Sequence, residues 1–463
     1  MRLTTGKRSQ SNSINKGVQQ KSIDAFFKPK KQKISDDTNA ENSQDMQWRE
    51  FGQTWLGKFG TPAPSTKFAA FDLDGTLIRT TGSSVHPQSS DDWRFYHPDV
   101  PKLLRNIHEQ GYRVVIMSNQ NGLVPRKGST ELSTRAQDFR LKLSKIAQQL
   151  EIPFTIFAAI GKDFMRKPSP GMWHMAELDN EGVVVDKALS FYVGDAAGRP
   201  AGWKRGVAKD HSDSDLAFAL NAGVAFYTPE EIITAEICAR SEPLPPPPPR
   251  TWPLGRFSPK SLSFDNDGHL ALMEGLEADV RAATEQKSGL LVLLVGPPAC
   301  GKSTFAAVHL APLGFECVNM DTLGTPKKCI NAVKEALEAG RFVVVDNTNP
   351  DPKSRGSFIN IANRAGASSV AVVFEHESRD LALHNNQYRS KLEQARFFYK
   401  SAQPASLYNM PVGVARVPDV AYHSYFKRFE LPTEAEGIAK ILHHSFAPSF
   451  DCPDDEGLWN QYH

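Results

Sequence analysis

The chain has 463 residues, of which 40% are hydrophobic and 23% are charged, and its formal net charge at pH 7 is +2. This is an ordinary composition for a globular protein, and the length is enough for about two to three domains. The small net charge excludes a chain that binds nucleic acid through bulk charge, so any basic surface must be local. The five cysteines form no C-x-x-C pair. A zinc module is therefore not expected, and a reducing compartment fits better than a disulfide framework.

No apolar run approaches the roughly 20 residues that are needed to cross a bilayer. The first ten residues, M-R-L-T-T-G-K-R-S-Q, also lack the apolar core of a secretory signal. We therefore expect no membrane association.

Residues 1–62 are rich in Ser, Asn, Gln and Lys and have little periodic apolar content, so we expect a disordered tail. Two short segments stand out in this tail. Residues 20–27 read Q-K-S-I-D-A-F-F, and residues 28–33 form the basic run K-P-K-K-Q-K.

A second low-complexity stretch, residues 241–264, contains five consecutive prolines, Pro245 to Pro249. Such a run favours an extended, semi-rigid spacer. It divides the folded chain into residues 65–240 and 265–463. Each part alternates strand-like apolar runs with helix-like stretches, which is typical of parallel α/β units. The predicted fold class is α/β, with two Rossmann-like parallel-sheet domains.

The first part is organised around residues 67–78, K-F-A-A-F-D-L-D-G-T-L-I. The apolar run predicts a buried strand that ends at Asp72 and Asp74. Ligands of open α/β sheets lie beyond the carboxyl ends of the strands. Residues i and i+2 of a strand share a face, so both carboxylates can converge on one substrate. The alternative for this motif alone is a strand followed by an Asp-Gly turn.

Three more predicted strands of this part run into polar motifs. Residues 113–117 lead to S-N-Q at Ser118, and residues 156–160 lead to R-K-P, which contains Lys167. Residues 189–193 lead to G-D-A-A-G-R-P, which contains Asp195. Taken singly, Ser118 or Lys167 would be a solvated loop residue. Together and in this order, the motifs predict one catalytic site.

D-L-D-G-T, S-N-Q, R-K-P and G-D-A-A-G-R-P resemble the motifs of the haloacid-dehalogenase superfamily of aspartate-nucleophile phosphatases. The last motif, with K-P-S-P-G-M-W, resembles the phosphatase half of the polynucleotide kinase 3′-phosphatase family. The resemblance implies that Asp72 is the nucleophile that forms an aspartyl-phosphate. It implies that Asp74 protonates the leaving sugar oxygen and later activates water. Ser118 and Lys167 would hold the phosphate, and Asp72, Asp195 and the backbone carbonyl of Asp74 would hold Mg²⁺.

The spacing of these motifs bears on the substrate. Small-molecule phosphatases of this superfamily usually carry an inserted cap domain. Neither residues 72–118 nor residues 118–167 leave room for a large cap, and an open mouth suits a polymer end. Trp203-Lys204-Arg205 would suit contact with a nucleic-acid strand. As an isolated triplet, it is more typical of a solvated loop.

The second part contains a phosphate-binding motif. The apolar run at residues 290–295 leads into G-P-P-A-C-G-K-S-T, and a helix-like stretch follows at residues 305–310. In this context backbone amides cradle the phosphates of ATP, Lys302 reaches the β- and γ-phosphates, and Ser303 ligates Mg²⁺. The residues expected to bind ATP are Gly296, Gly301, Lys302, Ser303 and Thr304.

Three later motifs, D-T-L-G at residues 321–324, D-N-T-N-P at 346–350 and H-N-N-x-x-R at 384–389, resemble the kinase half of the same family. The resemblance implies that Asp321 is the general base for the attacking 5′-hydroxyl. It also implies that Arg389 is a lid arginine that steadies the transferred phosphate. The resemblance covers roughly residues 66–445, in the order phosphatase and then kinase.

The N-terminal tail also contains a short motif that resembles a known binding motif. Gln20, Ile23, Phe26 and Phe27 match the motif by which repair and replication proteins bind the sliding clamp, proliferating cell nuclear antigen. The alternative is two stray phenylalanines in a disordered tail. The basic run at residues 28–33 is typical of a nuclear import signal or of a weak phosphate-binding patch. We therefore expect a nuclear protein.

Together these patterns predict a bifunctional DNA end-healing enzyme of strand-break repair. Its partners would be DNA ends with a 3′-phosphate or a 5′-hydroxyl, and its cofactors Mg²⁺ and ATP. One alternative is RNA end healing with the same chemistry, because neither catalytic motif reads the 2′-hydroxyl. Another is a clamp-bound scaffold with decayed catalytic domains. The complete sets of catalytic residues argue against the scaffold.

Overall fold

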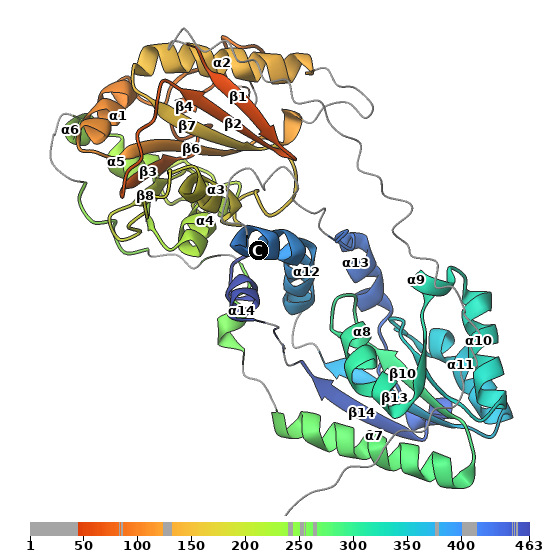
Figure 1. Cartoon of the computed structure of the whole chain (residues 1–463). Helices are drawn as coiled ribbons and strands as arrows, with labels where there is room; N and C mark the ends of the chain where they lie inside the picture. The colour runs from red at the N-terminus through yellow and green to blue at the C-terminus, as the bar shows by residue number, and fades with distance from the viewer. Residues whose placement is uncertain are drawn as a thin grey trace, which may run out of the picture. The chain divides into compact units, whose positions relative to one another are not determined.

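The computed structural model describes residues 45–463, except for 83, 85–86, 124–131, 239–243, 251–253, 255, 263–265, 376–378, 401–413, 447, 449 and 451. The described residues all belong to one of the two units into which the chain divides. Figure 1 shows the order of their helices and strands along the chain. The predicted clamp-binding motif (20–27) and basic run (28–33) lie outside the described residues. Within the described part of the chain, no helix is long and apolar enough to cross a membrane.

Seven strands form the first sheet. In spatial order they are β1 (Gln47–Phe51), β2 (Thr54–Phe59), β7 (Phe154–Ala159), β6 (Arg113–Asn119), β3 (Phe68–Phe71), β8 (Phe191–Val193) and β9 (Ala225–Tyr227). The five strands from β7 to β9 pair in parallel, whereas β1 and β2 extend the sheet in antiparallel pairing beyond β7. The short strands β4 (Ile78–Arg79) and β5 (Arg94–Phe95) pair separately. The site-bearing strand β3 therefore lies inside the sheet, between β6 and β8.

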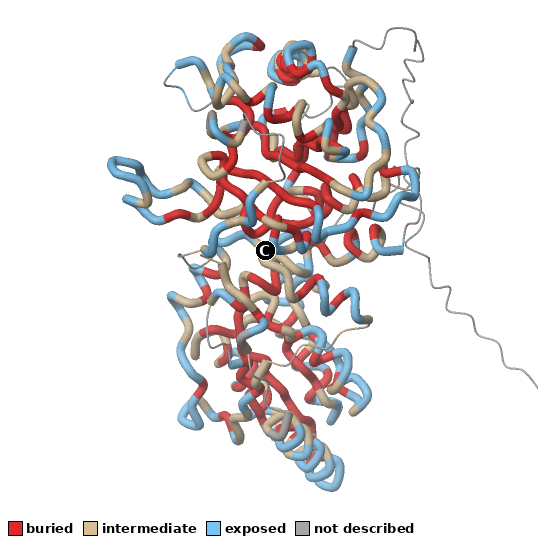
Figure 2. Tube along the Cα trace, turned by 90° about the vertical axis from the view of Figure 1, so that its left-hand side faces the viewer, coloured by how far each residue is buried: buried red, intermediate tan, exposed pale blue. Residues whose placement is uncertain are grey.

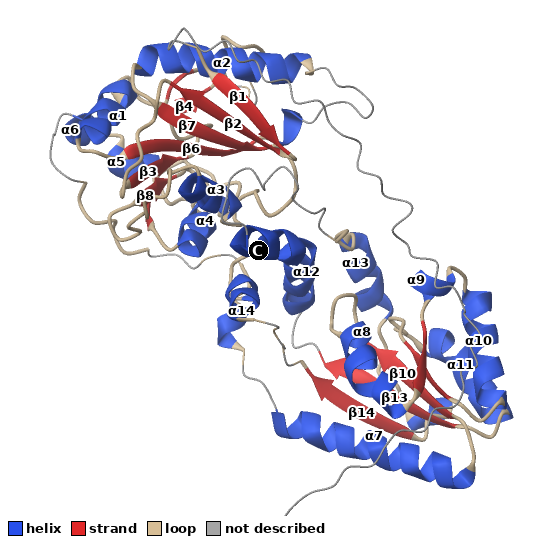
Figure 3. Ribbon diagram, in the orientation of Figure 1, coloured by secondary structure: helices blue, strands red, loops and turns tan. Residues whose placement is uncertain are grey.

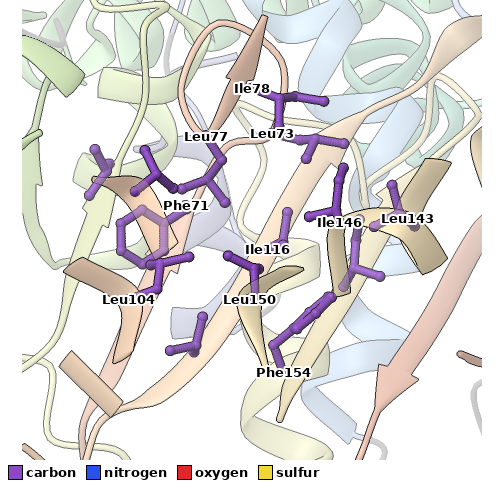
Figure 4. Packing of buried hydrophobic residues seen from close by; sticks show 14 of the residues in the cluster. Phe71, Leu73, Leu77, Ile78, Leu104, Ile116, Leu143, Ile146, Leu150 and Phe154 are labelled. Atoms are coloured by element: carbon purple, nitrogen blue, oxygen red, sulfur yellow. The ribbon is translucent and has the colours of Figure 1, made fainter. Parts of the chain in front are cut away.

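Helices cover both faces of this sheet (Figure 3). Successive residues of a strand point to opposite faces. Phe71 and Ile116 pack in one core with residues of α1 (Val100–Glu109) and α2 (Thr134–Leu150), and Figure 4 shows this cluster close to the site loop. Phe68 packs in the opposite core with residues of α3 (Gly171–Leu178) and α4 (Ser214–Ala222). The remaining short helices of this part are η2 (Asn121–Leu123), α5 (Pro229–Ile232) and α6 (Ala235–Cys238).

The prediction that residues 1–62 form a disordered tail is wrong for residues 47–59. These residues form the antiparallel hairpin of β1 and β2 at the edge of the first sheet. The hairpin is stabilised by burial, because Trp55 is only 1% exposed and Trp48 meets it edge to face. The sequence signal was the recurrence of Trp48, Phe51 and Trp55 within an otherwise polar stretch. The average polarity of the segment concealed this signal.

The second sheet has five strands, all parallel. In spatial order they are β11 (Phe315–Val318), β12 (Phe342–Val345), β10 (Leu290–Val295), β13 (Ser368–Glu375) and β14 (Lys440–Ser445). The inner strands β3, β7 and β10 are buried along their whole length (Figure 2). The predicted fold class, two parallel-sheet α/β domains, is confirmed.

Helices also cover both faces of the second sheet. Residues of α7 (Asn266–Gln286) and α8 (Lys302–Phe305) share a core with one face, and those of α10 (Pro326–Glu338) and α11 (Pro352–Arg364) with the other. After α8 the helix-like stretch predicted at residues 305–310 continues as a π-helical turn. The other elements of this part are η3 (Pro259–Ser261), the π-helical turn η4 (Ala306–Leu310), η5 (Ala311–Leu313), α9 (Met320–Leu323), α12 (Arg379–Lys400), α13 (Asp419–Arg428), η7 (Glu434–Glu436) and α14 (Pro453–Trp459).

Two helices of the second part pack on the first part. Phe398 of α12 and Leu458 of α14 belong to the same apolar core as Phe164, which lies in the loop after β7. Gln394 Oε1 of α12 accepts a hydrogen bond from the Phe164 backbone N–H at 3.0 Å. The C-terminal half of the chain thus contributes to the core behind the loop that carries Lys167.

The predicted spacer, residues 241–264, is also anchored to the first part. Arg250 forms an ion pair with Glu231 at 2.6 Å, and the Tyr227 hydroxyl donates to the carbonyl of Pro245 at 2.6 Å. Further along, Arg256 bonds Asp213 at 2.7 Å. Contacts at the first proline of the run and after the run therefore hold this segment to the first part.

Candidate active sites

The first site begins at the carboxyl end of β3. Asp72 continues the strand ladder, because its N–H donates to the Val193 carbonyl of β8 at 2.8 Å, and the residue is only 6% exposed. Gly75 has a φ of +86°, and a Cβ on it would lie 2.5 Å from an Asp195 oxygen. A glycine is therefore needed at position 75 for the loop to pass close to Asp195. Asp74 lies between them with its side chain 47% exposed.

The ammonium group of Lys167 is the positive charge around which this site is built. Its Nζ donates to Asp72 Oδ1 at 2.6 Å, to Asp215 Oδ1 at 2.7 Å and to the Tyr192 hydroxyl at 2.7 Å. Burial alone would lower the pKa of Lys167, but the carboxylates of Asp215 and Asp72 outweigh it and raise the pKa. The ammonium is thus kept charged in a buried position.

The S-N-Q motif at the end of β6 places Lys167 and Ser118. The Asn119 side chain accepts from the Lys167 backbone N–H at 3.0 Å and donates to the Lys167 carbonyl at 3.2 Å. Ser118 is buried at the end of β6, which pairs directly with β3. The structure therefore brings Asp72, Ser118 and Lys167 to one edge of the sheet, as the sequence predicts.

Three carboxylates gather beside Lys167. Asp72, Asp195 and Asp215 each offer an oxygen, and these oxygens lie within 4.8 Å of one another. Burial raises the pKa of Asp72 to about 7, and the Asp215 carboxylate adds to this while Lys167 opposes it. Burial, Asp72 and Asp215 raise the pKa of Asp195 to about 8. One ammonium cannot balance three crowded carboxylates, so the donor set fits a divalent, oxygen-seeking cation.

Sequence reasoning missed two members of this site, Asp215 and Tyr192. Asp215 lies in the first turn of α4, and its carboxylate is fully buried against Lys167 and the Ala196 N–H. An available signal was an aspartate at an apolar-facing position of a helix. Tyr192 alternates with core residues in β8 and gives no signal of its own. The predicted role of the Asp74 backbone carbonyl as a metal ligand stays a prediction.

The second site is the loop between β10 and α8. Gly296 is required here, because a Cβ would lie 2.7 Å from Cys300 Sγ and 2.9 Å from Phe374 Cβ. Gly301, with a φ of +96°, precedes the first turn of α8. Lys302 Nζ donates to the carbonyls of Gly296 at 3.0 Å and Pro297 at 2.6 Å. Thr304 is exposed on α8. The predicted P-loop residues thus lie together at the start of a helix.

Ser303 has a partner to which the sequence analysis gave no role. Its Oγ donates to Oδ2 of Asp346 at 2.6 Å. Asp346 is the residue that directly follows β12. A P-loop hydroxyl beside an aspartate at the end of a neighbouring strand is the arrangement by which such loops hold a metal ion with a nucleotide. The signal was present in D-N-T-N-P, which begins with Asp346.

Among the described residues, Asp321 and Arg389 form no hydrogen bond or ion pair with the P-loop. Asp321 is exposed on α9, and Arg389 is exposed on α12. Within the described residues, neither side chain makes a hydrogen bond or an ion pair. Their predicted roles stay predictions.

Fold and sites define the class: the first part has the buried acidic site of a phosphatase, and the second has the P-loop of a kinase. The family model described as polynucleotide kinase 3 phosphatase matches residues 67–233. A bifunctional polynucleotide phosphatase/kinase of Schizosaccharomyces pombe is 32% identical over 95% of this chain and 94% of its own. The chain therefore belongs to the bifunctional polynucleotide phosphatase/kinase family.

Two further relatives resemble only one part of the chain. The polynucleotide 3′-phosphatase of Saccharomyces cerevisiae is 32% identical over 35% of this chain and 85% of its own. The polynucleotide 3′-phosphatase ZDP of Arabidopsis thaliana is 36% identical over 36% of this chain and 24% of its own.

Proposed function

We propose that this protein heals DNA ends by removing 3′-phosphates at the first site and phosphorylating 5′-hydroxyls at the second. The observation that carries the proposal is the coexistence of both sites in one chain. The buried Lys167–Asp72 pair at 2.6 Å supports an anionic phosphate next to a carboxylate nucleophile. The Ser303–Asp346 pair supports a nucleotide bound at the P-loop.

The phosphatase reaction has two steps. In the first, a carboxylate oxygen of Asp72 forms a bond to phosphorus, and the bond from phosphorus to O3′ breaks with its electron pair left on O3′. That oxygen takes the proton of Asp74. In the second, water gives a proton to Asp74 and attacks phosphorus, which releases inorganic phosphate and the Asp72 carboxylate. Ser118 and Lys167 hold the phosphate through both steps.

The acidic site fits Mg²⁺, which Asp72 and Asp195 would ligate. Bound there, Mg²⁺ would offset the charge of the carboxylates and of the phosphate. Asp215 lies within the same oxygen cluster, but both of its oxygens already accept hydrogen bonds, Oδ1 from Lys167 and Oδ2 from the Ala196 backbone N–H. We therefore assign it the role of holding Lys167 rather than the metal.

At the second site, the P-loop amides and Lys302 would bind the phosphates of ATP. Ser303 and Asp346 would hold the accompanying Mg²⁺. Asp321 would accept the proton of the 5′-hydroxyl as that oxygen attacks the γ-phosphorus and ADP leaves. Arg389 would steady the transferred phosphoryl group.

One experiment tests both activities. The purified protein is given a nicked DNA duplex that carries a 3′-phosphate and a 5′-hydroxyl, with labelled ATP and Mg²⁺, and both ends are followed over time. We expect loss of the 3′-phosphate and labelling of the 5′ end. A faster reaction on the matched RNA nick would favour RNA end healing. No turnover on either substrate would favour a scaffold.

We also propose that the tail directs the protein to the nucleus and to the sliding clamp. Support comes from the sequence alone, through Gln20, Ile23, Phe26 and Phe27 and the basic run beside them. Buried aromatic anchors commonly dominate the binding energy of such short motifs. Calorimetric titration of a peptide spanning residues 16–33 against the clamp tests this. We expect binding that Phe26→Ala with Phe27→Ala abolishes, and equal affinity of both peptides would refute the motif.

A further inference from the structure

The carboxyl group of Asp74 is restrained on both of its oxygens. Oδ2 accepts a hydrogen bond from Gln120 Nε2 at 2.6 Å, and Oδ1 lies 3.5 Å from Lys142 Nζ. Asp74 is otherwise an exposed side chain on a loop, so without these two partners its carboxyl would sample several rotamers. Gln120 follows directly after β6, whereas Lys142 lies in the middle of α2.

Gln120 restrains two catalytic groups with a single amide nitrogen. Its Nε2 also donates to Ser118 Oγ, at 2.9 Å. An amide nitrogen carries two hydrogens, so both donors are used. Because Ser118 Oγ accepts from Gln120, its own O–H is left to donate elsewhere. The amide therefore sets the distance between the carboxyl of Asp74 and the hydroxyl of Ser118.

Lys142 occupies a core-facing position of α2. It lies in the buried stripe of this helix with Phe139, Leu143 and Ile146, and it is only 4% exposed (Figure 4 shows Leu143 and Ile146). Burying an ammonium costs free energy unless a partner compensates it. Its ion-pair partner is Asp74, and its Nζ also lies 5.6 Å from the centre of the Phe139 ring. An apolar side chain would fill this position at lower cost, so packing alone does not explain a lysine here.

We propose that Gln120 and Lys142 are positioning residues that aim the carboxyl of Asp74 at the leaving oxygen of the substrate. The proposal rests on the role assigned to Asp74 under the proposed function. Neither residue needs to touch the phosphate for this role. Their effect should therefore depend on how much the leaving group needs a proton.

The test compares two substrates that differ in the leaving group. In a 3′-phosphorylated oligonucleotide the leaving group is a sugar alkoxide, which is poor and requires a proton from the acid. In p-nitrophenyl phosphate the leaving group is p-nitrophenolate, which is good and hardly requires one. For Lys142→Met we expect kcat to fall about 10- to 100-fold on the oligonucleotide, with KM unchanged, and less than about 3-fold on the aryl phosphate. Gln120→Met should show the same selectivity, with an added loss on both substrates because it also touches Ser118.

Three control variants make the result specific. Lys145→Met lies one turn further along α2, where Lys145 pairs with Asp91 at the surface, and it should change neither rate. Lys142→Arg keeps the charge and should restore most of the oligonucleotide rate. In an Asp74→Asn background, Lys142→Met should cause no further selective loss, because the two residues act as one unit.

The outcomes distinguish the positioning role of Gln120 and Lys142 from the acid role of Asp74 on which it rests. Equal losses on the two substrates for Lys142→Met, or a full additional loss in the Asp74→Asn background, would overturn the positioning role while the function stands. Equal losses for Asp74→Asn itself would remove the acid role of Asp74, and the positioning role with it. A thermal unfolding curve of Lys142→Met distinguishes a folding defect, and Lys142→Arg then decides the question.

Discussion

The two catalytic regions differ in how their residues are held. In the first, Lys167 is buried and bonded to the buried carboxylates of Asp72 at 2.6 Å and Asp215 at 2.7 Å. In the second, the P-loop is internally bonded, whereas Asp321 and Arg389 are exposed. The first site is thus preorganised by its own ion pairs, whereas in the second only the P-loop and its neighbour Asp346 are bonded together.

Sheet topology explains much of this difference. The residues of the first site follow β3, β6, β7 and β8, which are consecutive neighbours in one sheet. In the second sheet, Asp321 follows β11, which is separated from the P-loop strand β10 by β12, and Arg389 lies on a helix outside the sheet. Neighbouring parallel strands bring side chains together without further help, whereas residues on distant elements need a ligand or a motion to meet.

The largest expected effects come from separating the two sites. Asp72→Ala should abolish 3′-phosphate removal, because the nucleophile is lost, and should leave the kinase rate within about 2-fold. Lys302→Ala should abolish the kinase and spare the phosphatase. Losses on removing a member of a catalytic unit commonly exceed about 10³-fold. Both rates are measured on the nicked duplex, and loss of both activities in either well-folded variant would contradict two independent sites.

The ion pairs of the first site give the next largest effect. Asp215→Asn keeps the shape but removes the charge that holds Lys167, so we expect the phosphatase kcat to fall about 10²-fold and the kinase to be unaffected. Asp213→Asn, two residues earlier, is the control, because its carboxylate bonds Arg256 rather than Lys167. Stopped-time assays of phosphate release give the rates. An unchanged kcat for Asp215→Asn would mean that Asp72 alone suffices to place Lys167.

The sequence could predict residues at the ends of strands, but not residues that act through contacts between distant elements. Motifs at strand ends predicted Asp72, Ser118, Lys167 and the P-loop in their observed places, because a strand followed by a short polar turn determines local geometry. Asp215 was missed, and Gln120 was given no role within S-N-Q, because Lys167 and Asp74, their partners, come from other elements and only tertiary structure shows these contacts. The hairpin of β1 and β2 was missed because its strands gain stability from an existing sheet rather than from their own composition.

A smaller effect tests whether the second part supports the first site. Phe398 of α12 packs in the core behind the Lys167 loop, at 5.7 Å between its ring centre and that of Phe164. Phe398→Ala should destabilise the protein by about 3 to 5 kcal/mol, since it leaves a cavity in a buried core. Thermal unfolding measures this. The control is Val420→Ala on α13, which is 70% exposed and should have little effect.

If Phe398→Ala unfolds the protein at the same temperature as the unaltered chain, α12 contributes nothing to the first part. Both rates are also measured below the unfolding temperature. A larger fall in the phosphatase rate than in the kinase rate would show that ion pairs within the first part do not organise the first site alone. In that case the first site would depend on a helix of the second part.

The smallest expected effect concerns Lys391, two residues beyond Arg389 on the same helix. It is 6% exposed, and burial together with the charges of Arg256 and Arg416 lowers its pKa to about 7, against the opposing charge of Asp163. A lysine whose pKa is lower in the folded state destabilises the protein most below that pKa. The penalty is relieved as the pH rises from about 7 toward the ordinary lysine pKa of 10.5. Lys391→Met should therefore stabilise the protein by about 2 kcal/mol at pH 6 and by progressively less above pH 8.

Thermal unfolding of both proteins between pH 6 and pH 9 measures this difference. Lys400→Met, at the end of the same helix, is the control for removing a lysine and should shift stability little at any pH. A stabilised Lys391→Met that keeps both activities would show that this buried charge serves neither site. A variant that is stabilised but loses kinase activity alone would show that the charge acts in the second site, where Arg389 is exposed. A variant that is destabilised at pH 6 would mean that Lys391 has a compensating partner in solution, and the sign of the pH dependence would reverse.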